Sequence, residues 1–292
     1  MQCIHIHIEG QVQGVGFRPF VYRLAQALQL KGWVCNGVDG VHIEAEGDEE
    51  TLRQFRTLLQ EEYPPIARIT RFVIEEKSLK YFTDFKIIES STSGKPNLLI
   101  TPDFGLCDSC RHELHDTANQ RHHYPFITCT QCGPRYSIIQ SLPYDRPTTS
   151  MRDFRMCTHC EEEYYNPLNR RYYSQTNSCP HCTIDTWLVN NRGELLAHTW
   201  EEAYPLLLSQ LQNGSIIAMK GIGGYLLLTD ATNASSIEKL RERKHRPTKP
   251  FALMYPDLDA LKLDAFVNDD EAKAFSSLSS PIVLVPVRQT PA

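Results

Sequence analysis

Cys107-Asp108-Ser109-Cys110 and Cys129-Thr130-Gln131-Cys132 are two C-x2-C pairs separated by 18 residues, and the same arrangement returns fifty positions later. A C-x2-C pair places two thiolates on one tight turn, so two pairs supply the four corners of a tetrahedral zinc site. Paired disulfides would suit a small secreted domain better than a chain of 292 residues. The repeat therefore predicts two structural Zn²⁺ sites, while the spacing alone leaves open pairing between the two halves. The predicted ligands are Cys107, Cys110, Cys129, Cys132, Cys157, Cys160, Cys179 and Cys182.

The composition excludes several classes of protein. A net charge of −5 argues against general affinity for nucleic acids or membranes. No stretch approaches the roughly 18 apolar residues of a membrane-spanning helix, and the N-terminus lacks the charged start and apolar run of a signal peptide. Free thiols without an export signal favour a reducing, cytoplasmic compartment. We expect an α+β multidomain protein without a membrane partner.

Residues 1–90 have the pattern of strand, helix, strand, strand, helix, strand. Isoleucines alternate in the first strand, and an apolar stripe from Phe17 to Leu28 indicates a helix. Gly32 stands where the C-cap of that helix is expected. The stretch from Trp33 to Glu46, interrupted by Asp39-Gly40, is typical of a β-hairpin. This order predicts a ferredoxin-like fold.

The rest of the chain divides by composition into three further segments. Residues 91–104 are predicted to be a linker, and residues 105–190 hold the two four-cysteine fingers. Residues 199–292 predict an α/β domain in which an apolar strand leads into a glycine-rich loop at 220–224. This domain is expected to be incomplete, because the sequence stops after a strand-like stretch at 281–285.

The loop between the first strand and the first helix is a candidate phosphate-binding site. Its backbone N–H groups and the helix dipole would attract an anion, and the planar fork of Arg18 suits two phosphate oxygens. An ordinary turn with a surface arginine is the alternative interpretation. The phosphate-binding residues predicted for this anion loop are Gln13, Gly14, Val15, Gly16, Phe17 and Arg18.

Two blocks of residues 1–90 resemble the acylphosphatase family. Gly10-Gln11-Val12-Gln13-Gly14-Val15-Gly16-Phe17-Arg18 is similar to the family signature, and Gly32-Trp33-Val34-Cys35-Asn36-x2-Asp39-Gly40 is similar to its second block. The resemblance implies two catalytic residues: Arg18 binds the phosphate and Asn36 holds the attacking water. No general base is needed if the substrate phosphate takes the proton.

A basic stretch lies between Lys239 and Lys249, which includes six lysines and arginines. A solvated helix end and binding of double-stranded RNA are two interpretations. A third is that Lys244-x-Arg246-x2-Lys249-Pro250-Phe251-Ala252-Leu253-Met254 resembles the YrdC (Sua5-type) family. That resemblance implies binding of ATP and an acyl-adenylate, with a substrate loop at Lys220. The nucleotide-binding candidates are Lys220, Lys244, Arg246 and Lys249.

The three segments together resemble the hydrogenase-maturation carbamoyltransferase family, HypF. The resemblance implies that carbamoyl phosphate is cleaved at Arg18 and Asn36, and that carbamate is then adenylated with ATP and Mg²⁺. A further domain would transfer the carbamoyl group to the C-terminal cysteine of the partner HypE. The family's Thr-Ser-Ala-Asn nucleotide block and transferase domain are missing here. We therefore expect an N-terminal portion that hydrolyses acyl phosphates and binds zinc.

A competing hypothesis is a zinc-binding adaptor with an inactive acylphosphatase fold and an RNA-binding basic stretch. The feature that discriminates between the two is the joint presence of Arg18 and Asn36, for which an adaptor has no use.

Overall fold

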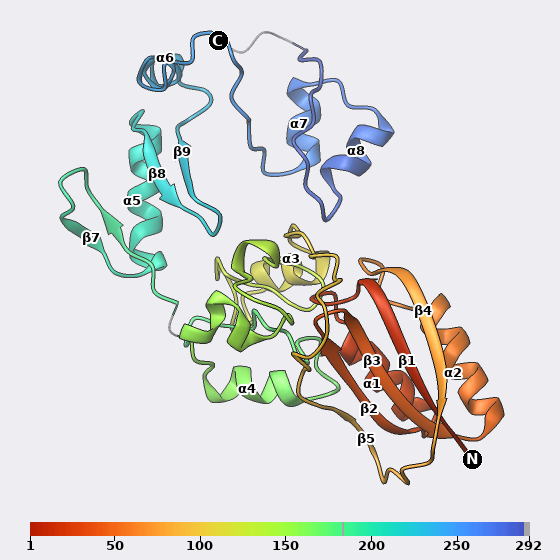
Figure 1. Cartoon of the computed structure of the whole chain (residues 1–292). Helices are drawn as coiled ribbons and strands as arrows, with labels where there is room; N and C mark the ends of the chain where they lie inside the picture. Colours follow the sequence, from red (N-terminus) through yellow and green to blue (C-terminus); the bar gives the residue numbers. More distant parts are fainter. Residues whose placement is uncertain (183, 289–292) are drawn as a thin grey trace. The chain divides into compact units, whose positions relative to one another are not determined.

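The computed structural model describes residues 1–182 and 184–288. Residue 183 of the predicted finger segment and residues 289–292 of the predicted YrdC-like segment therefore lie outside the described residues. The chain forms two compact units, Met1–Thr183 and Ile184–Ala292 (Figure 1). The first unit thus contains both the predicted acylphosphatase-like domain and most of the finger segment.

The first unit begins with a five-stranded sheet in the order β4-β1-β3-β2-β5. All neighbours are antiparallel except β2 and β5, which run parallel. Two helices, α1 and α2, pack on one face of this sheet (Figure 1). The predicted ferredoxin-like order is confirmed. The elements are β1 (Gln2–Gln11), α1 (Phe17–Ala27), β2 (Lys31–Gly37), β3 (Gly40–Gly47), α2 (Glu49–Glu61), β4 (Arg68–Lys77) and β5 (Phe85–Ile87).

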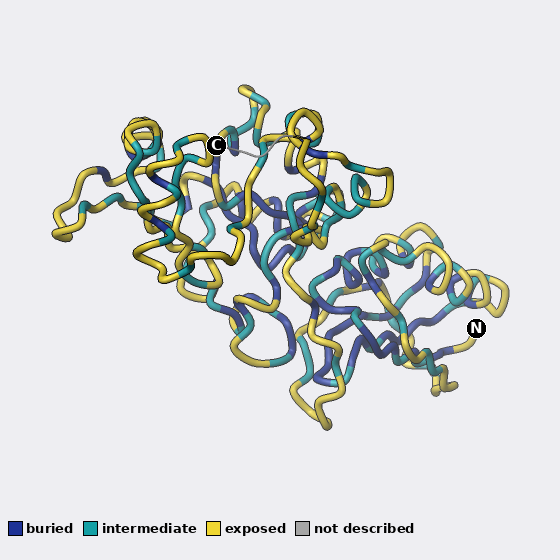
Figure 2. Tube along the Cα trace, turned by 90° about the horizontal axis from the view of Figure 1, so that it is seen from above, coloured by how far each residue is buried: buried dark blue, intermediate teal, exposed yellow. Residues whose placement is uncertain are grey.

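An apolar core lies between the sheet and the two helices. Ile6 and Ile8 of β1 are completely buried, and Phe17 of α1 and Phe55 of α2 pack into the same cluster. Figure 2 shows the buried segments of the chain in dark blue, running through this part of the molecule. Apolar burial of this kind is the main favourable term in folding, so the sheet gives α1 and the loop before it a fixed position.

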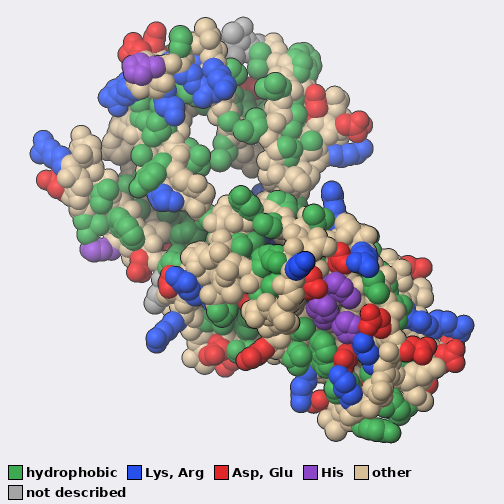
Figure 3. All heavy atoms as spheres, in the orientation of Figure 1, with side chains coloured by type: hydrophobic (Ala, Val, Ile, Leu, Met, Phe, Trp, Pro, Cys, Tyr) green, Lys and Arg blue, Asp and Glu red, His purple; other side chains and the backbone are tan. Residues whose placement is uncertain are grey.

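The opposite face of the sheet carries a group of histidines. The ring of His42 stacks on His7 and His5, with centroids 4.4 Å and 5.4 Å away. Burial alone would raise the pKa of Asp39, but its hydrogen bond with His42 and the nearby His7 hold it below the usual value. Figure 3 shows histidine side chains gathered on the surface. The three histidines are therefore half-buried on a polar face of the sheet.

The prediction that Gly32 caps the first helix is wrong. Helix α1 ends at Ala27, and Gln29 has the left-handed φ of 56° that follows it. Gly32 instead pairs with Ala45 inside the sheet, at a φ of +143°. A Cβ atom at this position would lie 1.9 Å from the carbonyl oxygen of Glu44. Glycine is needed here because the neighbouring strand approaches too closely for any side chain.

The finger segment contains only short helices. Each α-helix begins directly after the first cysteine of its half, and the connecting chain forms three 3-10 turns. The elements are α3 (Asp108–His115), η1 (Tyr136–Ile138), η2 (Arg146–Thr148), η3 (Ser150–Asp153) and α4 (Thr158–Tyr165).

The second unit has two antiparallel hairpins and four helices among its described residues. Many of its apolar side chains are exposed, including Leu284 and Met254. The strand-like stretch at 281–285 is irregular, because it pairs with no other strand in the described part of the chain. No helix in the described ranges is both long and apolar enough to span a membrane. The elements are β6 (Leu188–Val189), β7 (Leu195–Ala197), α5 (Trp200–Gln212), β8 (Ile217–Lys220), β9 (Tyr225–Leu228), α6 (Ala234–Arg243), α7 (Leu258–Asp264) and α8 (Asp269–Phe275).

Replacement of Gly32 by alanine should destabilise the sheet. The added Cβ must push the backbone of Glu44 away and strain a left-handed φ, so we expect a loss of at least about 2 kcal/mol in the free energy of unfolding. Urea unfolding followed by tryptophan fluorescence measures it. The neighbouring Lys31→Ala is the control and should change stability by no more than about 0.5 kcal/mol. Equal effects of the two variants would contradict the steric explanation.

Candidate functional site

The anion loop connects β1 to the N-terminus of α1. Gly14 and Gly16 have left-handed φ angles of 71° and 77°, which bring the loop backbone around toward the helix. Gly16 is the N-cap residue and no side chain caps the helix there. The first N–H groups of α1 are therefore available to an anion. Gln13 ties the loop to the β2–β3 hairpin, because its Nε2 donates to the carbonyls of Gly37 at 2.6 Å and Gly40 at 2.8 Å.

The guanidinium of Arg18 is nearly buried and is held on two sides. Its Nη2 donates to Asp145 Oδ1 at 2.6 Å, and its Nη1 donates to Ser90 Oγ at 3.3 Å. Its Cζ atom lies 5.5 Å from the ring centroid of Tyr173. Arg18 lines the cavity beside the anion loop, whereas Asp145 is not among the lining residues. The ion pair thus fixes the guanidinium without filling the cavity.

Asn36 lies at the end of β2 and lines the same cavity. Its Nδ2 donates to the carbonyl oxygen of Tyr144 at 3.2 Å, which sets the orientation of the amide. Its Oδ1 has no hydrogen-bond partner among the residues that the structure describes, although Asn36 is buried. The structure therefore brings the two candidate catalytic residues, Arg18 and Asn36, together at one cavity.

Residues of the finger segment form the other wall of this cavity. The cavity offers about 20 Å³ to the centre of a water molecule, which is room for at least one ordered water. Sequence reasoning missed this wall, because local spacing does not tell which distant segments meet. The structure buries every residue of the polar run Ser174-Gln175-Thr176-Asn177-Ser178. This uncharged polar run was the available signal in the sequence for a buried polar wall. The finger residues that line the cavity are Thr130, Arg135, Tyr144, Tyr173, Ser174 and Gln175.

The eight cysteines form two separate thiolate cages. Finger 1 is the cage of Cys107, Cys110, Cys129 and Cys132, and finger 2 is the cage of Cys157, Cys160, Cys179 and Cys182. In each cage all four sulfur atoms lie within 4.8 Å of one another. Two Sγ–Sγ distances in each cage, 3.6 to 4.0 Å, match the edge of about 3.8 Å that four Zn–S bonds of about 2.3 Å define. Each half therefore assembles its own cysteines in a geometry that fits zinc.

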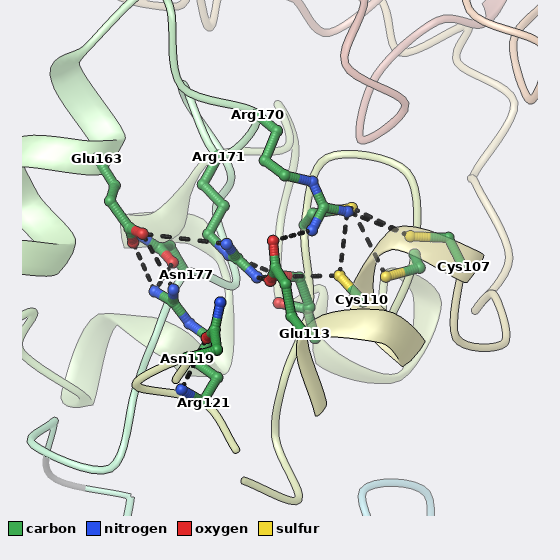
Figure 4. Close-up of polar contacts among 12 residues, drawn as sticks. Cys107, Cys110, Glu113, Asn119, Arg121, Glu163, Arg170, Arg171 and Asn177 are labelled. Carbon is green, nitrogen blue, oxygen red and sulfur yellow. Dashed lines mark hydrogen bonds and ion pairs between the residues drawn. The ribbon is translucent and has the colours of Figure 1, made fainter. Parts of the chain in front are cut away.

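Two buried arginines each pair with a glutamate in the other half of the repeat. Arg121 donates to Glu163 Oε1 at 3.0 Å, and Arg171, fifty positions after Arg121, donates to Glu113. Figure 4 shows each glutamate facing the arginine of the other half. The paired arginines hold the pKa values of both glutamates below the usual range, although burial alone would raise them. Glu113 and Glu163 are also fifty positions apart, so these two glutamates and two arginines form one reciprocal network.

The same network reaches the thiolates. Arg170 Nη2 lies 3.4 Å from the sulfur of Cys107 and 3.3 Å from those of Cys110 and Cys129 (Figure 4). A zinc ion with four thiolates carries a net negative charge, which such a guanidinium offsets. Position 120, fifty residues before Arg170, is glutamine. Finger 2 is instead contacted by Arg121, whose Nη2 is 3.5 Å from Cys160 Sγ.

The candidate nucleotide-binding residues lie in the second unit. Lys244 caps the C-terminus of α6, and the Arg246 guanidinium donates to the carbonyls of Lys249 at 3.2 Å and Pro250 at 2.7 Å. These three basic residues therefore belong to one turn. Lys220 ends β8 and donates to the carbonyl of Gly221. Among the described residues, no hydrogen bond or ion pair links Lys220 to that turn.

Family models match three parts of the chain. The acylphosphatase model matches residues 4–87, and the HypF finger model matches 106–139 and 156–189. The telomere recombination model of Sua5, YciO and YrdC proteins matches residues 209–291. These matches fall on the sheet, on the two cages and on the second unit.

Two relatives and one solved structure show the extent of the similarity. The carbamoyltransferase HypF of Synechocystis is 46% identical over 98% of this chain, which covers 37% of that relative. The acylphosphatase of Thermotoga maritima is 46% identical over 88 residues, 30% of this chain and 97% of the relative. A crystal structure of full-length HypF in its phosphate- and nucleotide-bound form superposes with a TM-score of 0.92 at 38% identity, over 99% of this chain and 38% of that one.

An acylphosphatase-like domain packed against two four-cysteine cages defines a class of multidomain zinc-finger protein. The chain belongs to the HypF family. The chain covers 37% of the Synechocystis protein and 38% of the solved one. It therefore spans little more than a third of the length of these relatives.

Glu163→Gln should strongly destabilise the finger segment. It leaves the buried guanidinium of Arg121 without its charge partner, and breaking such a buried pair costs about 3–5 kcal/mol. Urea unfolding measures the change. The control is Glu50→Gln, which removes a surface ion pair with Arg53 and should cost no more than about 1 kcal/mol. A loss at Glu163 as small as that at Glu50 would contradict the role given to the network.

Finger 2 should release zinc before finger 1. Cys157 is partly exposed, and the position in the first half that corresponds to Arg170 is occupied by Gln120, which carries no charge. Competition with a chromogenic chelator should show two phases, assigned by mass spectrometry of alkylated cysteines. Arg170→Gln, which copies the residue at position 120, should weaken zinc binding by finger 1 about 10–100-fold. Unchanged release from finger 1 in this variant would exclude a role for Arg170 in holding the metal.

Proposed function

We propose that this chain hydrolyses acyl phosphates at the anion loop, with carbamoyl phosphate as its substrate. The observation that carries the proposal is the meeting of Arg18, Asn36 and the N-terminus of α1 at one cavity. Such a site combines a fixed positive charge, backbone N–H donors and a free amide oxygen. These are the elements that phosphate binding and water positioning require.

In the proposed reaction, Arg18 and the N–H groups of the loop bind the phosphate. The unpaired Asn36 Oδ1 accepts a hydrogen bond from a water molecule, which attacks phosphorus. The bond between phosphorus and the acyl oxygen breaks, carbamate leaves as an anion, and a proton of the water passes to a phosphate oxygen. The protein contributes positioning and charge stabilisation, so no basic side chain is needed.

Asp145 is proposed to position Arg18 in this reaction. It approaches the guanidinium from outside the cavity and is itself held by Ser90. A guanidinium held in one orientation loses less conformational freedom when it binds phosphate. The finger segment would thereby contribute to a site whose candidate catalytic residues belong to the acylphosphatase-like domain.

The later steps are proposed by analogy with the full-length relatives, of which this chain covers little more than a third. Carbamate would be adenylated with ATP and Mg²⁺, and the carbamoyl group would pass to the C-terminal cysteine of HypE. Arg246, Lys244, Lys249 and Lys220 would neutralise the triphosphate and activate pyrophosphate as a leaving group. Support comes from the family match of residues 209–291 and from the nucleotide-bound state of the solved relative.

Arg18→Ala should abolish most phosphate release from carbamoyl phosphate. Loss of the charge that stabilises the transition state should lower kcat/KM by at least about 100-fold. Arg18→Lys keeps the charge but loses the planar fork, so its kcat/KM should lie between those of the wild type and Arg18→Ala. Colorimetric detection of phosphate with carbamoyl phosphate and acetyl phosphate measures the rates.

The matched control is Arg71→Ala, an exposed arginine of the same domain that pairs with Glu9. Its rate should equal that of the wild type. No release above background by the wild type, or full activity of Arg18→Ala, would reject the proposed hydrolysis. Co-purified RNA, detected from the ratio of absorbance at 260 and 280 nm, would then favour the adaptor.

A further inference from the structure

Three buried side-chain atoms in the described part of the chain have no hydrogen-bond partner. They are Asn36 Oδ1, Tyr144 OH and Ser174 Oγ. All three residues line the cavity beside the anion loop. Buried polar groups without a partner are rare in native proteins, and each calls for an explanation such as a bound ligand or water. Their coincidence at one cavity indicates an occupant that forms hydrogen bonds.

Two of these three atoms belong to the finger segment rather than to the acylphosphatase-like domain. The Thermotoga maritima acylphosphatase is covered to 97% by an 88-residue match, so it has no counterpart of the finger segment. Cleavage of an acyl phosphate on this fold therefore does not depend on the hydroxyls of Tyr144 and Ser174. They are free to serve another purpose, and their place in the cavity points to the choice of substrate.

The chemistry of the two hydroxyls suits one kind of acyl group. Carbamoyl phosphate has an amino group where acetyl phosphate has a methyl group. That amino group presents two N–H donors, and each hydroxyl oxygen offers acceptor lone pairs. We propose that Tyr144 and Ser174 accept hydrogen bonds from the carbamoyl amino group, so that the finger segment selects carbamoyl phosphate over acyl phosphates with apolar ends. This inference rests on the proposed function of the anion loop.

Tyr144 is held firmly against the anion loop. Its backbone N–H donates to Gln13 Oε1 at 3.0 Å, and a Cβ atom added to Gly14 would lie only 3.2 Å from its ring. Burial raises the pKa of Tyr144, although Arg135 and Arg18 act in the opposite direction, so the phenol keeps its proton. A neutral hydroxyl in a fixed position can discriminate between an amino group and a methyl group.

Arg135 connects this wall to the metal cage of finger 1. Its Nε donates to the carbonyl of Gly14, and its Nη atoms donate to the carbonyls of Cys129 and Cys132, both at 3.0 Å. Its Cζ atom lies 5.9 Å from the centroid of the Tyr144 ring. The turn that carries two zinc ligands thus also sets the distance between Tyr144 and the loop.

Binding of two non-hydrolysable phosphonates to the complete chain tests the proposal. Phosphonoacetamide carries the amino group, and acetonylphosphonate carries a methyl group in its place. Calorimetry should show that the wild type binds the amide at least about 100-fold more tightly, because the methyl compound leaves both hydroxyls unpaired. Tyr144→Phe and Ser174→Ala should each reduce this preference at least about tenfold, through weaker binding of the amide alone.

Tyr124→Phe is the matched control. It removes another buried tyrosine hydroxyl of the finger segment, which bonds to Ser178 and does not line the cavity, so the preference should be unchanged. Zinc content checks the fold of each variant. Tyr144→Phe should keep the thermal stability of the empty protein, because it removes a hydroxyl that has no partner there.

Equal binding of the two phosphonates, or no binding of either, would overturn the inference. So would a full preference for the amide in both Tyr144→Phe and Ser174→Ala, which would leave ordered water as the partner of the two hydroxyls. Failure of the proposed hydrolysis gives a different result. If the protein binds the amide preferentially but releases no phosphate, the selective pocket is supported and only the proposed hydrolysis is rejected.

Discussion

Arg121 and Arg171 carry their charges into the interior of the finger segment, where each meets a glutamate of the other half. A guanidinium removed from water is stable only if it is paired and hydrogen-bonded. The helices of the segment are short, and the apolar cluster around finger 2 consists of its cysteines and Met156, so the arginine–glutamate pairs and the two cages contribute much of what holds the segment together. The turns that face the anion loop are positioned by the same exchange.

A continuous set of contacts leads from the cages to the candidate active site. The Cys129–Cys132 turn holds Arg135, Arg135 holds the carbonyl of Gly14, and Tyr144 orients the amide of Asn36. The acylphosphatase-like domain supplies the candidate catalytic residues, and residues of the finger segment line the same cavity. The two parts therefore form one compact unit rather than two modules on a flexible linker.

The parts of this structure that depend on local pattern could be predicted from the sequence. Alternating isoleucines predicted β1, and the cysteine repeat predicted all eight thiolates of the cages, whereas their division between finger 1 and finger 2 came from the structure. Gly32 was misassigned, because a glycine required by a close neighbouring strand looks in sequence like a helix cap. The Arg18–Asp145 pair and the Ser174 wall could not be predicted. Both join residues more than a hundred positions apart, and no local periodicity records such a contact.

Because each arginine pairs with the other half of the repeat, the order in which the residues are synthesised also matters. All four cysteines of finger 1 have left the ribosome once residue 132 has emerged, so its cage can close around a metal early. The guanidinium groups that offset the charge of this cage belong to Arg170 and Arg171, which lie 3.3 Å and 3.9 Å from the sulfur of Cys110 and are translated later. Glu113 is likewise unpaired until then. Finger 1 must therefore pass through a nascent, charge-exposed state that only the second half of the repeat can end.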